Sequence, residues 1–171
     1  MWHYIKAVCR ILFPVINIYF FSIKIKNRHK EKYPIDERYK IARKLLSKVP
    51  RVLDCDIHVE GLENLPKEGC YSLFSNHLSM LDPVFYISLI EKPLAIVAKN
   101  EIKKLPVVPT IFDFIDGELL DRNDLKQSLK VMMRIQEDLT LNKHNWLIFP
   151  EGTRNKDKNR KPVNLGKDKT I

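Results

Sequence analysis

Apolar runs of strand length alternate with helical patterns in the second half of the chain, and this alternation limits the possible folds more than any other feature. The strands are predicted at residues 70–75, 94–98, 118–121 and 145–149. Helices are predicted at residues 83–90 and 124–141, the second with Asn123 or Asp124 as its N-cap. The apolar side of the second helix would carry Leu125, Leu129, Met132, Met133, Gln136 and Leu139. Because alternating strands and helices build α/β folds, we expect an α/β domain with a mixed sheet flanked by helices over residues 53–171.

Residues 1–52 are expected to form a membrane-associating helical region. Residues 11–25 are strongly apolar and are flanked by lysines and arginines. The uninterrupted apolar stretch is shorter than the roughly 20 residues of a spanning helix, and Pro14 and Asn17 lie within it. The pattern favours an interfacial or partly inserted anchor. A single membrane span and a buried core helix remain alternatives.

A basic segment at residues 24–51 follows this apolar run. Apolar residues recur in it at helical spacing, and lysines and arginines fill the other side. Such a helix can lie on an anionic membrane, or it can pack on the core as a surface helix. Pro50 is expected to end it, and a short strand with a turn at Gly61 is expected within residues 56–65.

The formal net charge of +9 points to an anionic partner, such as nucleic acid, lipid headgroups or a phosphorylated substrate. Nucleic acid fits least, because the basic residues lack a recognised reading motif or an interleaved aromatic platform. The three cysteines, Cys9, Cys55 and Cys70, form no CxxC pair. Neither a disulfide framework nor a zinc site is therefore expected, and a reducing compartment fits the chain better.

The segment NHLSMLD at residues 76–82 offers His77 as a base and Asp82 as its orienting carboxylate. A histidine can take a proton from an attacking hydroxyl, and a carboxylate at its other ring nitrogen fixes the tautomer. Positions i and i+5 of a helix point about 140° apart, so the pair can meet only in a turn that leads into the helix. Pro83 favours a boundary there. By spacing alone, a helix-capping aspartate beside a loop histidine is the more ordinary interpretation.

A second polar segment, FPEGTR at residues 149–154, can hold an anionic group. The guanidinium of Arg154 matches the oxygens of a phosphate, Thr153 adds a hydroxyl donor, and Gly152 lets the backbone approach a ligand. Taken alone, a surface turn with a salt bridge explains this segment too. In open α/β sheets ligands bind at the carboxyl ends of the strands, and His77, Arg122 and residues 151–154 each follow a predicted strand. These groups are therefore expected at one edge of the sheet.

The pair NHxSxxD and FPEGTR, in this order and spacing, resembles the glycerolipid acyltransferase family, specifically the bacterial 1-acyl-sn-glycerol-3-phosphate acyltransferases. Three further segments are similar to blocks of that family: VEGLENLP at 59–66, AKNEI at 98–102 and LDR at 120–122. The resemblance covers about residues 56–155. Members of the family continue with a lysine-glycine segment and a strand that carries a valine-proline motif. We therefore expect the C-terminal part of the domain to be missing from this chain.

The resemblance implies two catalytic residues and a set of substrate-binding residues. His77 would be the general base and Asp82 its orienting partner. The second segment would hold the glycerol phosphate of the acceptor through its glutamate and its arginine, on a loop shaped by the two residues between them. The implied substrate-binding residues are Lys99, Arg122, Glu151, Gly152, Thr153 and Arg154.

The implied reaction is acyl transfer from acyl-CoA or acyl-carrier protein to the sn-2 hydroxyl of 1-acyl-sn-glycerol 3-phosphate, which forms phosphatidic acid. The thioester is a co-substrate, and neither a cofactor nor a metal is implied. The expected partners are a lysophospholipid, the thioester carrier and an anionic membrane surface. The enzyme is expected at the cytoplasmic face of the cell membrane, either peripheral or anchored by its N-terminus. Two alternatives remain: a related acyltransferase with another acceptor, such as glycerol 3-phosphate, and a non-catalytic membrane-binding fragment.

Overall fold

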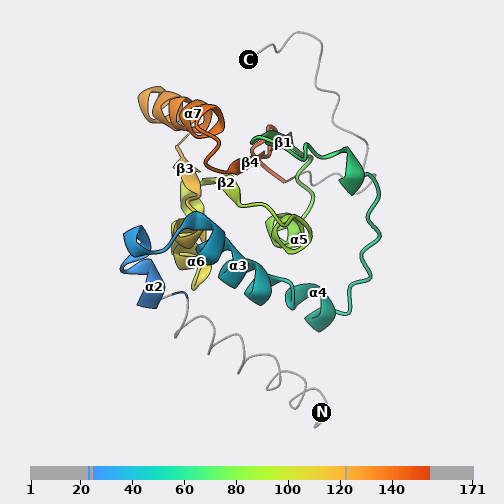
Figure 1. The fold of residues 1–171 in the computed structure, drawn as a ribbon. Helices are drawn as coiled ribbons and strands as arrows, with labels where there is room; N and C mark the ends of the chain where they lie inside the picture. Colours follow the sequence, from blue (N-terminus) through green and yellow to red (C-terminus); the bar gives the residue numbers. More distant parts are fainter. Residues whose placement is uncertain (1–22, 24, 122, 155–171) are drawn as a thin grey trace.

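A four-stranded sheet forms the centre of the part of the chain that the structure describes (Figure 1). The computed structural model describes residues 23, 25–121 and 123–154; most of the apolar run at 11–25, Arg122 and residues 155–171 lie outside the described part. The strands are β1 (Ser72–Phe74), β2 (Leu94–Lys99), β3 (Glu118–Leu120) and β4 (Asn145–Ile148), in the order β1-β4-β2-β3. Every pairing among the described strands is parallel. The predicted α/β fold is confirmed, and no antiparallel strand of the expected mixed sheet lies among the described strands.

Side chains of successive strand residues point to opposite faces of the sheet, and both faces are covered. In β2, Leu94 and Ile96 belong to one buried cluster, whereas Ala95 belongs to the other. In β4, Leu147 and Trp146 divide in the same way. The buried residues of β2 therefore form a continuous apolar run, because each face of the sheet carries its own core.

Helices on the two faces complete the layers. α3 (Ile35–Leu46), α5 (Asp82–Leu89) and α6 (Val108–Phe114) contribute to the larger cluster, and α7 (Leu125–Thr140) covers the other face. Figure 1 shows α5 and α7 on opposite sides of the strands. The shorter elements are α2 (Ile25–Asn27), α4 (Val49–Val52) and the 3-10 turns η2 (Lys30–Lys32), η3 (Leu62–Asn64) and η4 (Asn100–Lys104).

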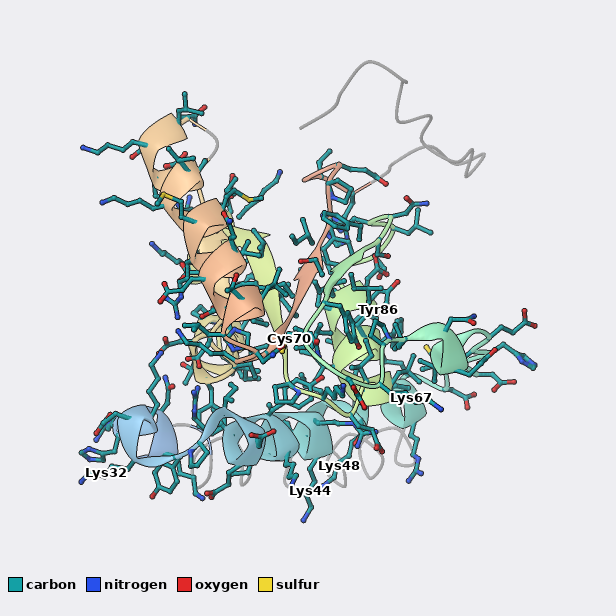
Figure 2. The ribbon with its side chains drawn as sticks, turned by 45° about the horizontal axis from the view of Figure 1, so that its top comes forward. Lys32, Lys44, Lys48, Lys67, Cys70 and Tyr86 are labelled. Carbon is teal, nitrogen blue, oxygen red and sulfur yellow. The ribbon has the colours of Figure 1, made fainter. Side chains whose placement is uncertain are left out.

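The basic helix α3 packs on the core. Tyr39, Ala42 and Leu45 are buried in the larger cluster, while Lys40 and Lys44 are exposed. Figure 2 shows Lys44 and Lys48 pointing away from the sheet. The packed surface helix, one of the two interpretations left open for this segment, is observed, and association with a membrane stays a prediction. Within the described residues, no helix combines the length and the apolar character that a membrane crossing requires.

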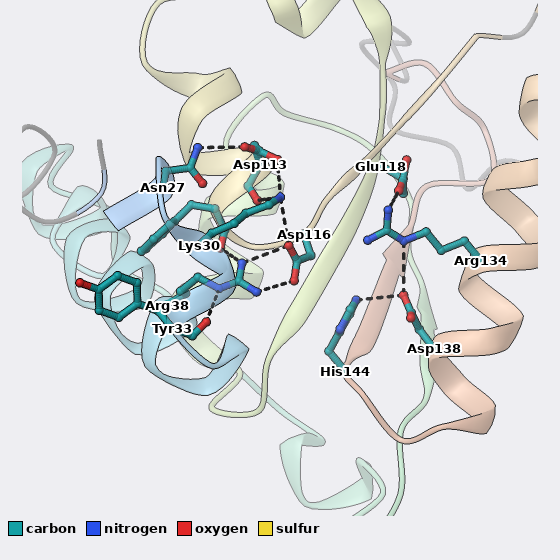
Figure 3. Close-up of polar contacts among 11 residues, drawn as sticks. Asn27, Lys30, Tyr33, Arg38, Asp113, Asp116, Glu118, Arg134, Asp138 and His144 are labelled. Atoms are coloured by element: carbon teal, nitrogen blue, oxygen red, sulfur yellow. Dashed lines mark hydrogen bonds and ion pairs between the residues drawn. The ribbon is translucent and has the colours of Figure 1, made fainter. Parts of the chain in front are cut away.

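Ion pairs attach this N-terminal region to the sheet domain, and the pair between Arg38 and Asp116 is largely buried. The guanidinium of Arg38 on α3 donates to both carboxylate oxygens of Asp116, at 3.0 and 2.6 Å, and to the carbonyl of Phe114. Lys30 contacts Asp113 and Asp116 from the preceding turn. Figure 3 shows the side chains of Lys30 and Arg38 meeting Asp113 at the end of α6 and Asp116 in the turn before β3. α3 is therefore an integral part of the described fold.

Two local predictions were wrong: the helix end at Pro50 and the short strand predicted from alternating apolar residues before Gly61. The helix ends at Leu46, and Pro50 lies in the first turn of the separate helix α4, a position where its missing N–H costs no hydrogen bond. Residues 55–61 form no strand, although the turn at Gly61 is present with a φ of 84°. None of the described strands pairs with residues 55–61, so their alternating pattern gains nothing from an extended conformation.

The buried side of α7 is not the predicted one. Asp124 caps the helix as expected, since its carboxylate accepts from Gln127 N at 3.0 Å. Val131 and Ile135 face the sheet, however, beside Ala95 and Trp146. Four of the residues assigned to the apolar side are instead exposed: Leu125 (84%), Leu129 (60%), Met132 (44%) and Met133 (62%). Only Leu139 packs, in part, against the sheet.

Candidate active site

The loop after β1 brings the predicted base to its carboxylate. His77 Nδ1 lies 3.0 Å from Asp82 Oδ2, with 20% and 16% of the two side chains exposed. Asp82 begins α5, and residues 75–81 form the irregular turn that the pairing requires. Because an ionised carboxylate only accepts hydrogen bonds, Nδ1 carries the proton in this contact, and Nε2 is left as the proton acceptor.

The carboxylate of Asp82 also shapes the loop that holds the histidine. Its Oδ2 accepts from the backbone amides of Leu78 at 2.7 Å and Ser79 at 2.8 Å, in addition to the imidazole. Ser79 Oγ accepts from Leu81 N at 3.1 Å, which closes the turn. One oxygen therefore fixes both the ring of His77 and the backbone of the two residues that follow it.

Phe149 joins the two sequence motifs in space. Its ring stacks on the imidazole of His77, with the ring centroids 4.4 Å apart and the planes 30° from parallel. Phe149 follows β4 directly and is the first residue of FPEGTR. The loop that carries Glu151 and Arg154 thus starts against the histidine, as the rule for carboxyl ends of parallel strands predicts.

A hydroxyl pair supports this contact from the side of α5. The ring of Tyr86 meets Phe149 edge-on, with centroids 6.4 Å apart, and Tyr86 OH lies 2.7 Å from Ser75 Oγ. Ser75 N donates to Ile148 O at 3.1 Å, which ties the end of β1 to the end of β4. Sequence reasoning assigned no role to Phe149, Tyr86 or Ser75. The one available signal was that Ser75 directly precedes the first motif and that Phe149 opens the second.

The FPEGTR loop turns sharply after the strand. Gly152 N donates to Phe149 O at 2.9 Å, and Gly152 adopts a φ of 58°, which favours glycine over residues with a Cβ. Glu151 is half-buried, and Thr153 and Arg154 are exposed at the end of the described segment. The loop therefore follows the histidine site and leaves the arginine accessible to a ligand.

The middle segments reach the same edge of the sheet. Lys99 ends β2 and is aligned with Leu120 of β3, and β2 pairs with β4 on its other side. Asp121 Oδ1 accepts from Asn123 N at 3.0 Å, and its Oδ2 lies 3.4 Å from Asn100 Nδ2, so Asp121 organises the turn after β3. Arg122, predicted as a phosphate ligand, lies outside the described residues.

Known proteins similar to this chain are acyltransferases. The family model described as Acyltransferase matches residues 56–167. The 1-acyl-sn-glycerol-3-phosphate acyltransferase of Pseudomonas aeruginosa is 38% identical over 97 residues, which is 56% of this chain and 37% of that protein. The corresponding protein of Saccharomyces cerevisiae is 32% identical over 104 residues, 60% of this chain and 34% of that protein. The chain thus spans less than half the length of these curated relatives.

A solved structure shares the fold. The crystal structure of the 1-acyl-sn-glycerophosphate (LPA) acyltransferase PlsC from Thermotoga maritima superposes with a TM-score of 0.56 and 26% identity, covering 91% of this chain and 59% of that one. The family match includes both polar segments, and the fold brings their loops together around His77. By sequence and by fold, this chain belongs to the acyltransferase family.

Proposed function

We propose that the protein transfers an acyl group from a thioester to the sn-2 hydroxyl of a 1-acyl-sn-glycerol 3-phosphate. The observation that carries the proposal is the single site formed by the two motifs: the His77–Asp82 hydrogen bond with the FPEGTR loop stacked against it. The names of the relatives from Pseudomonas aeruginosa and Saccharomyces cerevisiae support this acceptor. Acyl-CoA and acyl-carrier protein are both proposed as donors.

In the proposed reaction His77 Nε2 takes the proton of the acceptor hydroxyl as the oxygen attacks the thioester carbonyl. The tetrahedral intermediate collapses, the C–S bond breaks, and the leaving thiolate takes the proton back from the imidazolium. The charge of Asp82 stabilises that imidazolium. The two hydroxyls that adjoin the base are engaged elsewhere, Ser75 Oγ with Tyr86 and Ser79 Oγ with a backbone amide. This favours direct transfer over a covalent acyl-enzyme.

Charge supports the binding of an anionic acceptor at a membrane surface. Arg154 is exposed five residues after Phe149, the residue stacked on His77, and Lys99 ends the strand next to β4. Guanidinium and ammonium groups at this edge could hold the phosphate of the acceptor while the hydroxyl faces Nε2. Lys32 and Lys44 are exposed on the N-terminal region (Figure 2), and we propose that this region holds the enzyme at an anionic leaflet on the cytoplasmic side of the membrane.

The test supplies the complete gene product with labelled acyl-CoA or acyl-carrier protein and an acceptor panel. The panel comprises 1-acyl-sn-glycerol 3-phosphate, glycerol 3-phosphate and a lysophospholipid without a free phosphate. We expect phosphatidic acid as the main product. His77→Ala should lower turnover by roughly 10²–10⁴-fold, as for a lost general base. Preference for glycerol 3-phosphate would reassign the acceptor, and near-normal turnover of a folded His77→Ala protein would reject the mechanism.

A further inference from the structure

We propose that Phe149 is a positioning residue for the imidazole of His77, held in place by Tyr86 and Ser75. This inference rests on the proposed function, because it assigns these residues a task in the same acyl transfer. It concerns how the base is aimed, and none of the three residues is required to touch a substrate.

The hydrogen bond to Asp82 leaves one degree of freedom in the ring. A contact from Nδ1 to a single oxygen fixes the position of that nitrogen, but the imidazole can still tilt about the line that joins the two atoms. A planar group stacked on one face removes this freedom. The Phe149 ring does so, at a centroid distance of 4.4 Å and within 30° of parallel. The hydrogen bond and the stack together define the direction in which Nε2 points.

Phe149 is itself held by a closed ring of contacts. Tyr86 meets it edge-on at 65°, an arrangement that aromatic pairs favour. The Tyr86 hydroxyl lies 2.7 Å from Ser75 Oγ, and Ser75 N donates to the carbonyl of Ile148, the residue before Phe149. The contacts therefore run from Phe149 through Tyr86 and Ser75 to Ile148, which is bonded to Phe149 in the chain. Both aromatic rings also pack against the larger apolar core, so they have a rigid support.

This arrangement couples the base to the loop proposed to hold the acceptor. The Phe149 ring sits on His77, while its backbone carbonyl accepts from Gly152 N at 2.9 Å in the turn that leads to Arg154. The orientation of the base and the path of the loop thus depend on one residue. A substitution of Phe149 changes the ring that aligns the base and keeps the carbonyl that holds the loop, so it should affect turnover more than acceptor binding.

The test compares Phe149→Leu, Phe149→Tyr and Phe74→Leu in the complete gene product. Leucine keeps an apolar side chain but has no planar face, whereas tyrosine keeps the ring. Phe74 is 62% exposed in β1, so Phe74→Leu makes the same chemical change outside the stack and serves as the matched control. For Phe149→Leu we expect a kcat about tenfold lower with an acceptor KM within about twofold of the unsubstituted value. Phe149→Tyr and Phe74→Leu should retain kcat within about twofold.

A second readout does not depend on activity. In protein with labelled histidines, the His77 ring-proton resonance, assigned by its loss in His77→Ala, is expected to move downfield in Phe149→Leu because the ring current is lost. Unchanged kcat in Phe149→Leu, an equal loss in Phe149→Tyr, or an unmoved resonance would each overturn the inference. Failure of the unsubstituted protein to acylate any acceptor would overturn the proposed function instead, and the catalytic role of Phe149 with it.

Discussion

Replacing Asp82 should separate the catalytic role of its charge from its role in holding the loop. Its Oδ2 accepts three hydrogen bonds, one from the imidazole of His77 and two from the amides of Leu78 and Ser79. Asp82→Asn keeps an oxygen that can accept the two amide bonds but removes the negative charge. Asp82→Ala removes every acceptor. Both variants therefore lose the charge beside the base, but only Asp82→Ala also loses the acceptor that holds the loop.

The magnitudes follow from these contacts. Hydrogen bonds to a charged group contribute roughly 1.5–3 kcal/mol each. Leu78 is exposed and water can replace part of the loss, so we use the lower value for the two amide bonds. Asp82→Ala should then lower the free energy of unfolding by about 3 kcal/mol, and Asp82→Asn by about 1 kcal/mol or less. Both should lower kcat by at least about 10²-fold, because the imidazolium loses its counter-charge and the tautomer is no longer fixed.

Two measurements decide the outcome. Urea unfolding followed by circular dichroism gives the stability of each variant, and initial rates with a labelled acyl donor give kcat. Turnover of Asp82→Asn near that of the unsubstituted protein would refute the catalytic role of the charge. Equal stabilities of the two variants would show that the amide bonds have no role in holding the loop.

Three further predictions concern the anion contact, a close approach in the core and the buried ion pair. Arg154→Ala should raise the acceptor KM at least about tenfold with little effect on kcat. Arg154→Lys should recover only part of the loss, because lysine lacks the forked donors of a guanidinium. An unchanged KM in Arg154→Ala would argue against a phosphate contact. Gly117→Ala would place a Cβ 2.6–2.8 Å from ring atoms of Phe112, so urea unfolding should show a loss of about 1–3 kcal/mol, and unaltered stability would contradict this packing. Burial is the largest influence on the pKa of Asp116 and raises it, but the hydrogen bonds and charges of Arg38 and a neighbouring lysine outweigh burial and leave the pKa below its usual value. The resulting stability is present at neutral pH and is lost as the pH falls below about 4, so the unfolding free energies of the unsubstituted protein and Asp116→Asn should converge there; a constant difference down to pH 3 would refute this linkage.

The strands could be predicted because a parallel sheet buried on both faces leaves a direct sequence pattern. The runs at 94–98 and 145–149 became β2 and β4 within one residue at their carboxyl ends. Helix α6 was missed, since it is short and has prolines at 106 and 109, where local signals favour a loop. The first turn of a helix tolerates proline, and packing of Phe112 and Phe114 in the core stabilises this helix.

The face of α7 could not be chosen from periodicity alone. Two apolar rows run along the helix at the same spacing, one through Leu125 and Leu129 and the other through Val131 and Ile135. The second row packs beside Ala95 and Trp146 of the sheet. That choice depends on the shape of the surface below the helix, which the sequence of the helix does not contain.

The same distinction separates the predicted and the missed parts of the candidate site. His77 and Asp82 lie five residues apart, so turn geometry and proline placement allowed their contact, and the family resemblance was needed to predict it. The stack between His77 and Phe149 depends on β1 and β4 lying side by side, a pairing between distant segments that no local pattern specifies. In sequence, Phe149 resembled the last apolar residue of a buried strand. Because Phe149 lies at the carboxyl end of that strand, its ring supports the base and does more than fill the core. A residue of one motif can therefore have a role that only its contact with the other motif in the folded protein shows.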